Sequence, residues 1–170
     1  IYTTRSDSKK GTSDEIEHNG KRYRVSQVFD YSGQGFYKAF EQKGLKVNED
    51  LIILTDNIEE FDEKINNFFD NNLIDGVFAL DEHTAVTTIK IGLKRGIKIP
   101  EELSIIGFAD GVWSRRLTPS LSTVSQHGPE IGEVATKMLI DKLESKEEIY
   151  NHKTTVIKTE LRQRESTKKL

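Results

Sequence analysis

Apolar residues in the middle of the chain form short continuous runs, and these runs alternate with segments in which apolar residues recur every three or four positions. The runs 51–55, 75–80 and 103–108 have the length and composition of buried strands. The segments 58–69 and 84–94 gather their apolar residues on one side of a helix. Strand and helix in alternation, with short connections, predict parallel strands joined by helical crossovers.

The amino-terminal part extends this pattern and adds a hairpin. Residues 1–4 predict another strand, and residues 35–43 predict a helix that ends at Gly44. Asn19-Gly20 stands between β-forming residues, which is the preferred sequence for a two-residue hairpin turn. We therefore expect a hairpin inserted on the surface at this point.

The carboxyl-terminal part predicts one more helix and one more strand. The helix spans 128–144, and its apolar face holds Ile131, Val134, Ala135, Met138 and Leu139. Residues 154–162 predict an edge strand with Ile157 and Leu161 facing inward, followed by a basic, frayed tail at 166–170. The predicted fold class is α/β, a Rossmann-like parallel sheet flanked by helices with an inserted hairpin.

The composition of the chain excludes several classes of function. The 170 residues carry a formal net charge of −3, which gives no general attraction for a polyanion. The chain has no cysteine, no apolar run of bilayer length and no signal-like amino terminus, so we expect a soluble cytoplasmic protein. No spacing of His83, His127 and His152 suggests a metal site, and no cofactor motif is present.

Three motifs occur in a fixed order in the second half. They are Gly-Ile-Lys-Ile-Pro-Glu-Glu-Leu-Ser-Ile-Ile-Gly-Phe-Ala-Asp at 96–110, Leu-Thr-Pro-Ser-Leu-Ser-Thr-Val-Ser-Gln at 117–126, and Glu-Leu-Arg-Gln-Arg-Glu-Ser-Thr at 160–167. In this order and spacing they resemble the closing part of the LacI/GalR (lac-repressor/gal-repressor) family of bacterial transcription regulators. Upstream, 75–85 resembles the same family's strand into an Asn-Asp pair and the following helix.

The resemblance implies a periplasmic-binding-protein-like type I effector domain, with two Rossmann-like halves, three crossing segments and a small ligand in the cleft. Residues 1–126 and 153–164 would form the carboxyl-terminal half-domain. The helix within 127–152 would pack on the amino-terminal half-domain, which, like the DNA-binding headpiece, is expected to lie outside this chain. The implied function is a ligand-responsive transcription regulator that forms a homodimer, binds a sugar or other small-molecule effector, and reaches operator DNA only through the headpiece.

Two other functions stay open. An exported periplasmic sugar-binding protein would share the cleft and the fold. An enzyme on a Rossmann-like fold is less favoured, because the acids Asp81, Glu82 and Asp110 have no nucleophile beside them in any known catalytic pattern.

Ligands of open α/β sheets bind outside the carboxyl ends of the strands. This rule selects Asp81 and Glu82 after one strand, and Asp110 and Trp113 after the next. Carboxylates can accept hydrogen bonds from sugar hydroxyls, and an indole can stack on a sugar face. Ser32 completes the candidate set, because it stands where the family usually has Arg.

Some of these candidate residues differ from the family pattern, and some could have a purely structural role. Ala109 replaces a usual acid, and Asp81-Glu82 replaces Asn-Asp. Asp81 could instead cap the following helix, with Glu82 favoured by the helix dipole, and Trp113 could serve packing.

The helix at 128–144 would lack its family partner. Burial of one aliphatic side chain contributes about 1.5–3 kcal/mol. We therefore expect this helix to fold onto its own sheet, to dock with a second copy, or to be disordered.

Overall fold

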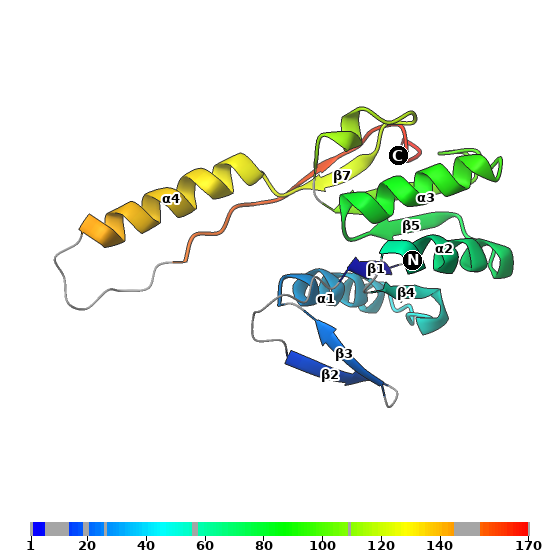
Figure 1. Ribbon diagram of the computed structural model, residues 1–170, viewed down its shortest axis with the longest axis horizontal. Helices are drawn as coiled ribbons and strands as arrows, with labels where there is room; N and C mark the ends of the chain where they lie inside the picture. The colour runs from blue at the N-terminus through cyan, green and yellow to red at the C-terminus, as the bar shows by residue number, and fades with distance from the viewer. Residues whose placement is uncertain are drawn as a thin grey trace.

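The fold is taken from a computed structural model that describes residues 2–5, 14–18, 21–25, 27–55, 58–108, 110–144 and 154–169, with side chains at 34–54, 59–108, 110–144 and 154–169. A six-stranded sheet runs through its centre in the order β4-β1-β5-β6-β7-β8 (Figure 1). All neighbours are parallel except β8, which is antiparallel to β7. The strands are β1 (Tyr2–Arg5), β4 (Ile52–Thr55), β5 (Gly76–Ala79), β6 (Ser104–Phe108), β7 (Ser122–Ser125) and β8 (Glu160–Arg162).

Helices connect the strands, so the predicted α/β class is confirmed. They are α1 (Gln27–Gln42), α2 (Ile58–Asn71), α3 (Glu82–Lys94) and α4 (Gly128–Glu144), with short 3-10 turns η1 (Glu49–Leu51) and η2 (Trp113–Arg115). The helix predicted at 35–43 begins earlier, at Gln27. The glycines at 33 and 35 lower helix propensity but do not end the helix.

The predicted hairpin is also confirmed. Strands β2 (Asp14–His18) and β3 (Lys21–Val25) pair antiparallel, with His18 opposite Lys21. This register leaves two residues for the turn, Asn19 and Gly20, which lie outside the described residues.

The main core lies between the sheet and helices α2 and α3. Val77 and Ala79 of β5 face this core, whereas Phe78 between them faces the opposite side and stacks on Phe36 of α1. Strand alternation therefore places α1 on the other face of the sheet. The core residues buried on the α2–α3 side are Ile53, Phe61, Ile65, Phe68, Val77, Ala79, Ala85, Ile89, Ile91, Ile99, Leu103, Ile105 and Leu121.

Gly107 of β6 permits a close approach between sheet and helix. A Cβ atom there would lie 3.0 Å from the Leu121 side chain and 3.3 Å from Cβ of Ala85. Glycine at this point lets α3 approach the strand that ends at the candidate site.

Helix α3 has well-defined ends. The Asp81 side chain accepts a hydrogen bond from the Thr84 amide at 2.8 Å, which caps the amino terminus. Gly96 ends the helix with a φ of +77°, the left-handed conformation that glycine adopts readily at helix ends.

The end of the chain differs from its prediction. Only 160–162 pairs as a strand, and the Leu161 side chain is 59% exposed, so the prediction of an inward Ile157–Leu161 pair is wrong. The inward direction is instead taken by Arg162, which pairs with a buried carboxylate. The tail at 166–170 is not frayed at its start either, because Ser166 is fully buried.

Hydrogen bonds explain why Ser166 is buried. Its hydroxyl donates to the Ile105 carbonyl at 2.6 Å and accepts from the Ser122 amide at 2.8 Å. Its backbone also pairs with Ile105 and Ser120. These bonds fasten the end of the chain to β6 and β7.

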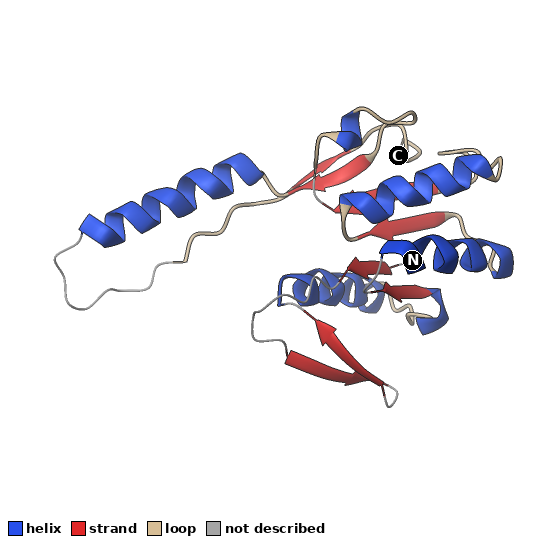
Figure 2. Ribbon diagram, viewed as in Figure 1, coloured by secondary structure: helices blue, strands red, loops and turns tan. Residues whose placement is uncertain are grey.

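Helix α4 extends away from the sheet as a separate arm (Figures 1 and 2). None of its residues is buried, and Leu139 is 57% exposed. The structure contradicts two of the three predicted outcomes, because the segment is a helix rather than disordered and does not pack on its own sheet. The chain leaves β7 at Ser125 and turns at His127, whose φ is +53°. Docking with a second copy stays a prediction.

Candidate functional site

The carboxyl ends of β5, β6 and β7 meet at one edge of the sheet, beside the point where the chain departs toward α4. A hollow of about 500 Å³ lies there. It is lined by Asp110 and Gly111 after β6, Arg115 of η2, residues 125–130 and Arg162 of β8. This is where the strand-end rule predicts a ligand.

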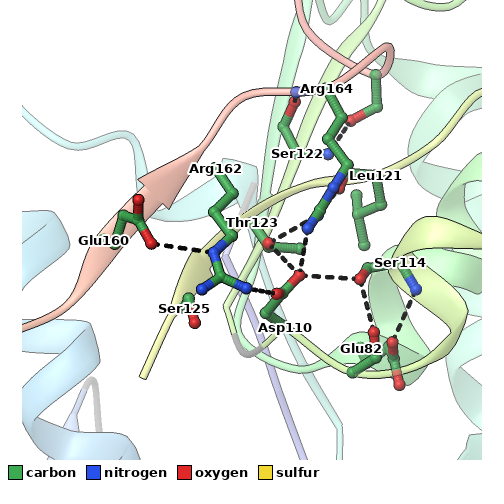
Figure 3. Close-up of polar contacts among 12 residues, drawn as sticks. Glu82, Asp110, Ser114, Leu121, Ser122, Thr123, Ser125, Glu160, Arg162 and Arg164 are labelled. Atoms are coloured by element: carbon green, nitrogen blue, oxygen red, sulfur yellow. Dashed lines mark hydrogen bonds and ion pairs between the residues drawn. The ribbon is translucent and has the colours of Figure 1, made fainter. Parts of the chain in front are cut away.

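Asp110 is the centre of a polar network at this edge (Figure 3). Its side chain is 5% exposed. Oδ1 accepts hydrogen bonds from Thr123 Oγ1 at 2.9 Å, Ser114 Oγ at 3.0 Å and Arg164 Nη2 at 2.7 Å. Oδ2 accepts a hydrogen bond from Arg162 Nη1.

These donors determine the charge state of Asp110. Burial by itself would raise the pKa of this carboxyl, but the hydrogen bonds from Arg164, Thr123, Ser114 and Arg162 outweigh burial and hold its pKa well below the usual range. Asp110 is therefore ionised at neutral pH, with both oxygens engaged by protein donors.

Arg162 and Arg164 are part of the site although the sequence interpretation gave them no role. Arg162 also donates from Nε to Glu160 at 3.0 Å. Arg164 also donates from Nη1 to the Leu121 carbonyl at 2.6 Å. The signal was present for Arg164, since it is the first residue of the Arg-x-Ser-Thr motif.

Glu82 positions the loop after β6. Its Oε1 accepts a hydrogen bond from the Ser114 amide at 2.9 Å. Its carboxylate also lies against Gly111, where any side chain would collide with it. Glu82 thereby joins the start of α3 to η2 (Figure 3).

Asp81 acts as the cap of α3 through Oδ1, so its alternative role as a helix cap is confirmed. Its second oxygen, Oδ2, is buried and has no hydrogen-bond partner among the described residues.

The remaining candidates are placed less closely around the hollow. Trp113 opens η2 with its side chain 60% exposed and does not line the hollow. The side chains of Ser32 and Ala109 lie outside the described residues.

The described residues form neither a metal site nor a membrane-spanning helix. No group of three His, Asp or Glu side chains could hold a metal ion there. Among the described helices, none combines the length and the apolar character needed to cross a bilayer.

Comparison with known proteins gives consistent matches. The family model of the periplasmic binding protein-like domain matches residues 21–167. The chain is 36% identical over 100 residues to the HTH-type transcriptional regulator DegA of Bacillus subtilis (strain 168), a match covering 58% of this chain and 30% of DegA. It is 39% identical over 97 residues to the ribose operon repressor of Halalkalibacterium halodurans, which covers 56% of this chain and 28% of the repressor.

A solved structure supports the same fold. The transcriptional regulator CelR, in complex with cellobiose, superimposes with a TM-score of 0.73 at 21% identity, covering 82% of this chain and 42% of CelR. In each of these three comparisons the match spans less than half the length of the relative.

Proposed function

The chain belongs to the periplasmic binding protein-like domain family, among the effector domains of LacI-family regulators, and we propose that it forms the effector-binding and dimerisation part of a ligand-responsive transcription regulator. The observation that carries the proposal is the hollow at the strand ends, which adjoins the segments leaving the sheet. A ligand bound there would contact both the loop after β6 and those segments.

The proposal places the chain as one half of a two-part effector domain. Residues 1–126 and 153–164 would form the carboxyl-terminal half-domain, and the helix within 127–152 would pack on an amino-terminal half-domain. The exposed apolar side chains of α4, such as Ile131, Leu139 and Leu143, support this role. Operator DNA would be bound in the cytoplasm by the homodimer through an additional headpiece, since two relatives are an HTH-type regulator and an operon repressor by name.

The proposed effector is a sugar or a sugar derivative. One relative is a ribose operon repressor, and one structural neighbour holds cellobiose. Trp113 would offer an exposed indole face for stacking, and Ser32 would replace the family's Arg. Asp81 would offer Oδ2 only if ligand binding made this buried oxygen accessible, because Asp81 does not line the hollow. Glu82 and Asp110 remain candidate contacts, although protein donors already occupy Oε1 of the first and both oxygens of the second.

Regulation would follow from a shift between open and closed states of the cleft. A ligand changes operator affinity only by its difference in affinity for the two states. An exported sugar-binding protein would share the cleft, but the curated relatives named above are regulators. We propose no enzymatic activity for the chain.

A thermal-shift screen tests the proposal. Neutral and phosphorylated sugars are added to the full-length protein, and a true effector raises the melting temperature because it binds only the native state. The variant Gln126→Ala, in the lining of the hollow, should reduce this shift, whereas Lys158→Ala, on an exposed position, should not. A screen in which no saccharide raises the melting temperature would refute a sugar effector.

A further inference from the structure

We infer that Asp110 is a positioning residue that fixes the direction in which the two crossing segments leave the sheet, and that Arg162 and Arg164 are its partners in this role. The crossing segments are 125–128, which leads into α4, and 154–160, which returns from it. The inference goes beyond the proposed function, because it concerns the hinge and not the ligand.

The strand register brings the parts together. Strands β7 and β8 pair antiparallel at one end of the six-stranded sheet, with Thr123 opposite Arg162 and Ser125 opposite Glu160. This pair of strands is called the ribbon below. Asp110 follows β6, the other neighbour of β7. One carboxylate thus receives a donor from β7, Thr123, and a donor from β8, Arg162, and it ties three adjacent strands at the place where two of them depart (Figure 3).

The charged partners of Asp110 come from β8 and the residues just after it. The guanidinium groups of Arg162 and Arg164 both converge on Asp110. Asp110 is nearly fully buried and the Arg164 side chain is 15% exposed. Loss of the Asp110 charge would therefore leave two guanidinium groups close together, one of which, that of Arg164, has little access to water. Glu160 accepts a hydrogen bond from Arg162 only at Nε. The resulting repulsion would act on β8 and its pairing with β7.

The loop after β6 is part of the same device. Ser114 donates to Asp110 from its hydroxyl and to Glu82 from its amide. A connected path of hydrogen bonds therefore runs from the first turn of α3, through η2 and Asp110, to Thr123 of β7 and Arg162 of β8, the strands from which the crossing segments depart. Movement of the loop would be transmitted to the direction of the ribbon.

Hydrogen exchange measured on the 170-residue chain tests this assignment without any ligand or DNA. In Asp110→Asn we expect amide exchange in β7 and β8 to rise about tenfold or more, because charge-assisted hydrogen bonds are lost. Exchange in α3 should rise less, because it reports only the loss of overall stability. Asp110→Glu should restore part of the protection. Asp141→Asn, an exposed carboxylate on α4, is the matched control and should change nothing in the ribbon.

Two results would overturn the inference. Unchanged exchange in β7 and β8 of Asp110→Asn would leave Asp110 without a positioning role, and an equal rise in all elements would make it a general contributor to the fold. If Asp110→Asn does not fold, Arg162→Gln decides the matter, since it removes one donor and leaves Thr123, Ser114 and Arg164 in place. A ribbon-specific rise in Arg162→Gln supports the inference, and its absence refutes it.

Discussion

Helices α3 and α4 are both amphipathic and follow strands of the same sheet, yet they differ completely in burial. Seven of the thirteen residues of α3 are buried, including Ala85, Ile89 and Ile91. None of the seventeen residues of α4 is buried. The apolar face of α3 meets Leu103, Ile105 and Leu121 from the same chain, whereas the face of α4 meets none of the described core residues.

The difference shows that one part of the chain completes its own core and the other does not. Packing of the apolar face normally provides most of the stability of a helix. For α3 that packing is provided by the sheet of the same chain; this sheet with the helices packed on it is called the sheet half below. For α4 the described residues of this chain provide no such packing.

The test with the largest expected effect replaces one leucine in each of the two parts by alanine. Leu103→Ala deletes a fully buried side chain and should lower the free energy of unfolding by about 2–5 kcal/mol. Leu139→Ala, the matched change on α4, should alter it by no more than about 0.5 kcal/mol. Urea unfolding of both variants gives the two values. Equal losses would mean that α4 is covered in solution, and the contrast between the helices would be lost.

A second test concerns the junction between the two parts and uses pH. Because the folded-state pKa of Asp110 is lowered, its stabilisation is present above the unfolded carboxyl pKa of about 4 and is lost as the pH falls toward the folded value. Asp110→Asn should therefore cost about 1.5–3 kcal/mol at pH 7. The difference in unfolding free energy between wild type and variant should shrink between pH 4 and pH 2.

The control for the acid titration is Asp141→Asn, because Asp141 is exposed on α4. Its unfolding free energy should follow that of the wild type at every pH. A difference between wild type and Asp110→Asn that stays constant down to pH 2 would show that the Asp110 charge does not provide the stabilisation.

A third test asks whether the end of the chain, around Ser166, unfolds together with the sheet. Ser166→Ala removes the hydroxyl that joins the Ile105 carbonyl to the Ser122 amide and leaves both groups unpaired in a buried place. We expect a loss of about 1–3 kcal/mol in chemical unfolding. Thr154→Ala, at an exposed position, should have almost no effect. A Ser166→Ala variant as stable as the wild type would place the tail outside the cooperative unit.

The sequence predicted the sheet half well because its signals are local. The pattern that identifies each element lies within that element. Apolar runs mark β4, β5 and β6, and apolar residues at helical spacing mark α2 and α3. Gly96 at a positive φ likewise follows from a local need for glycine. Such features depend on few distant residues.

The tail and the candidate site were harder because they depend on distant pairs. Ser166 is buried through partners 44 and 61 positions away in the chain. Asp110 was selected by the strand-end rule, but its engagement by Arg162 and Arg164, 52 and 54 positions away, could not be inferred from spacing. Strand β8 was expected to turn apolar residues inward, and long-range charge pairing placed Arg162 there instead.

The smallest expected effect concerns the start of α3 and separates two roles of Asp81. Asp81→Ala removes the cap on the Thr84 amide and should lower the free energy of unfolding by about 1 kcal/mol. Asp81→Asn keeps a capping oxygen but removes the charge on the unpartnered Oδ2, so its stability should stay within a few tenths of a kcal/mol of the wild type. If thermal unfolding shows no loss in Asp81→Ala, capping contributes nothing measurable at this position. A loss confined to Asp81→Ala would show that the cap, which is local to the chain, stabilises α3 independently of any ligand at Oδ2.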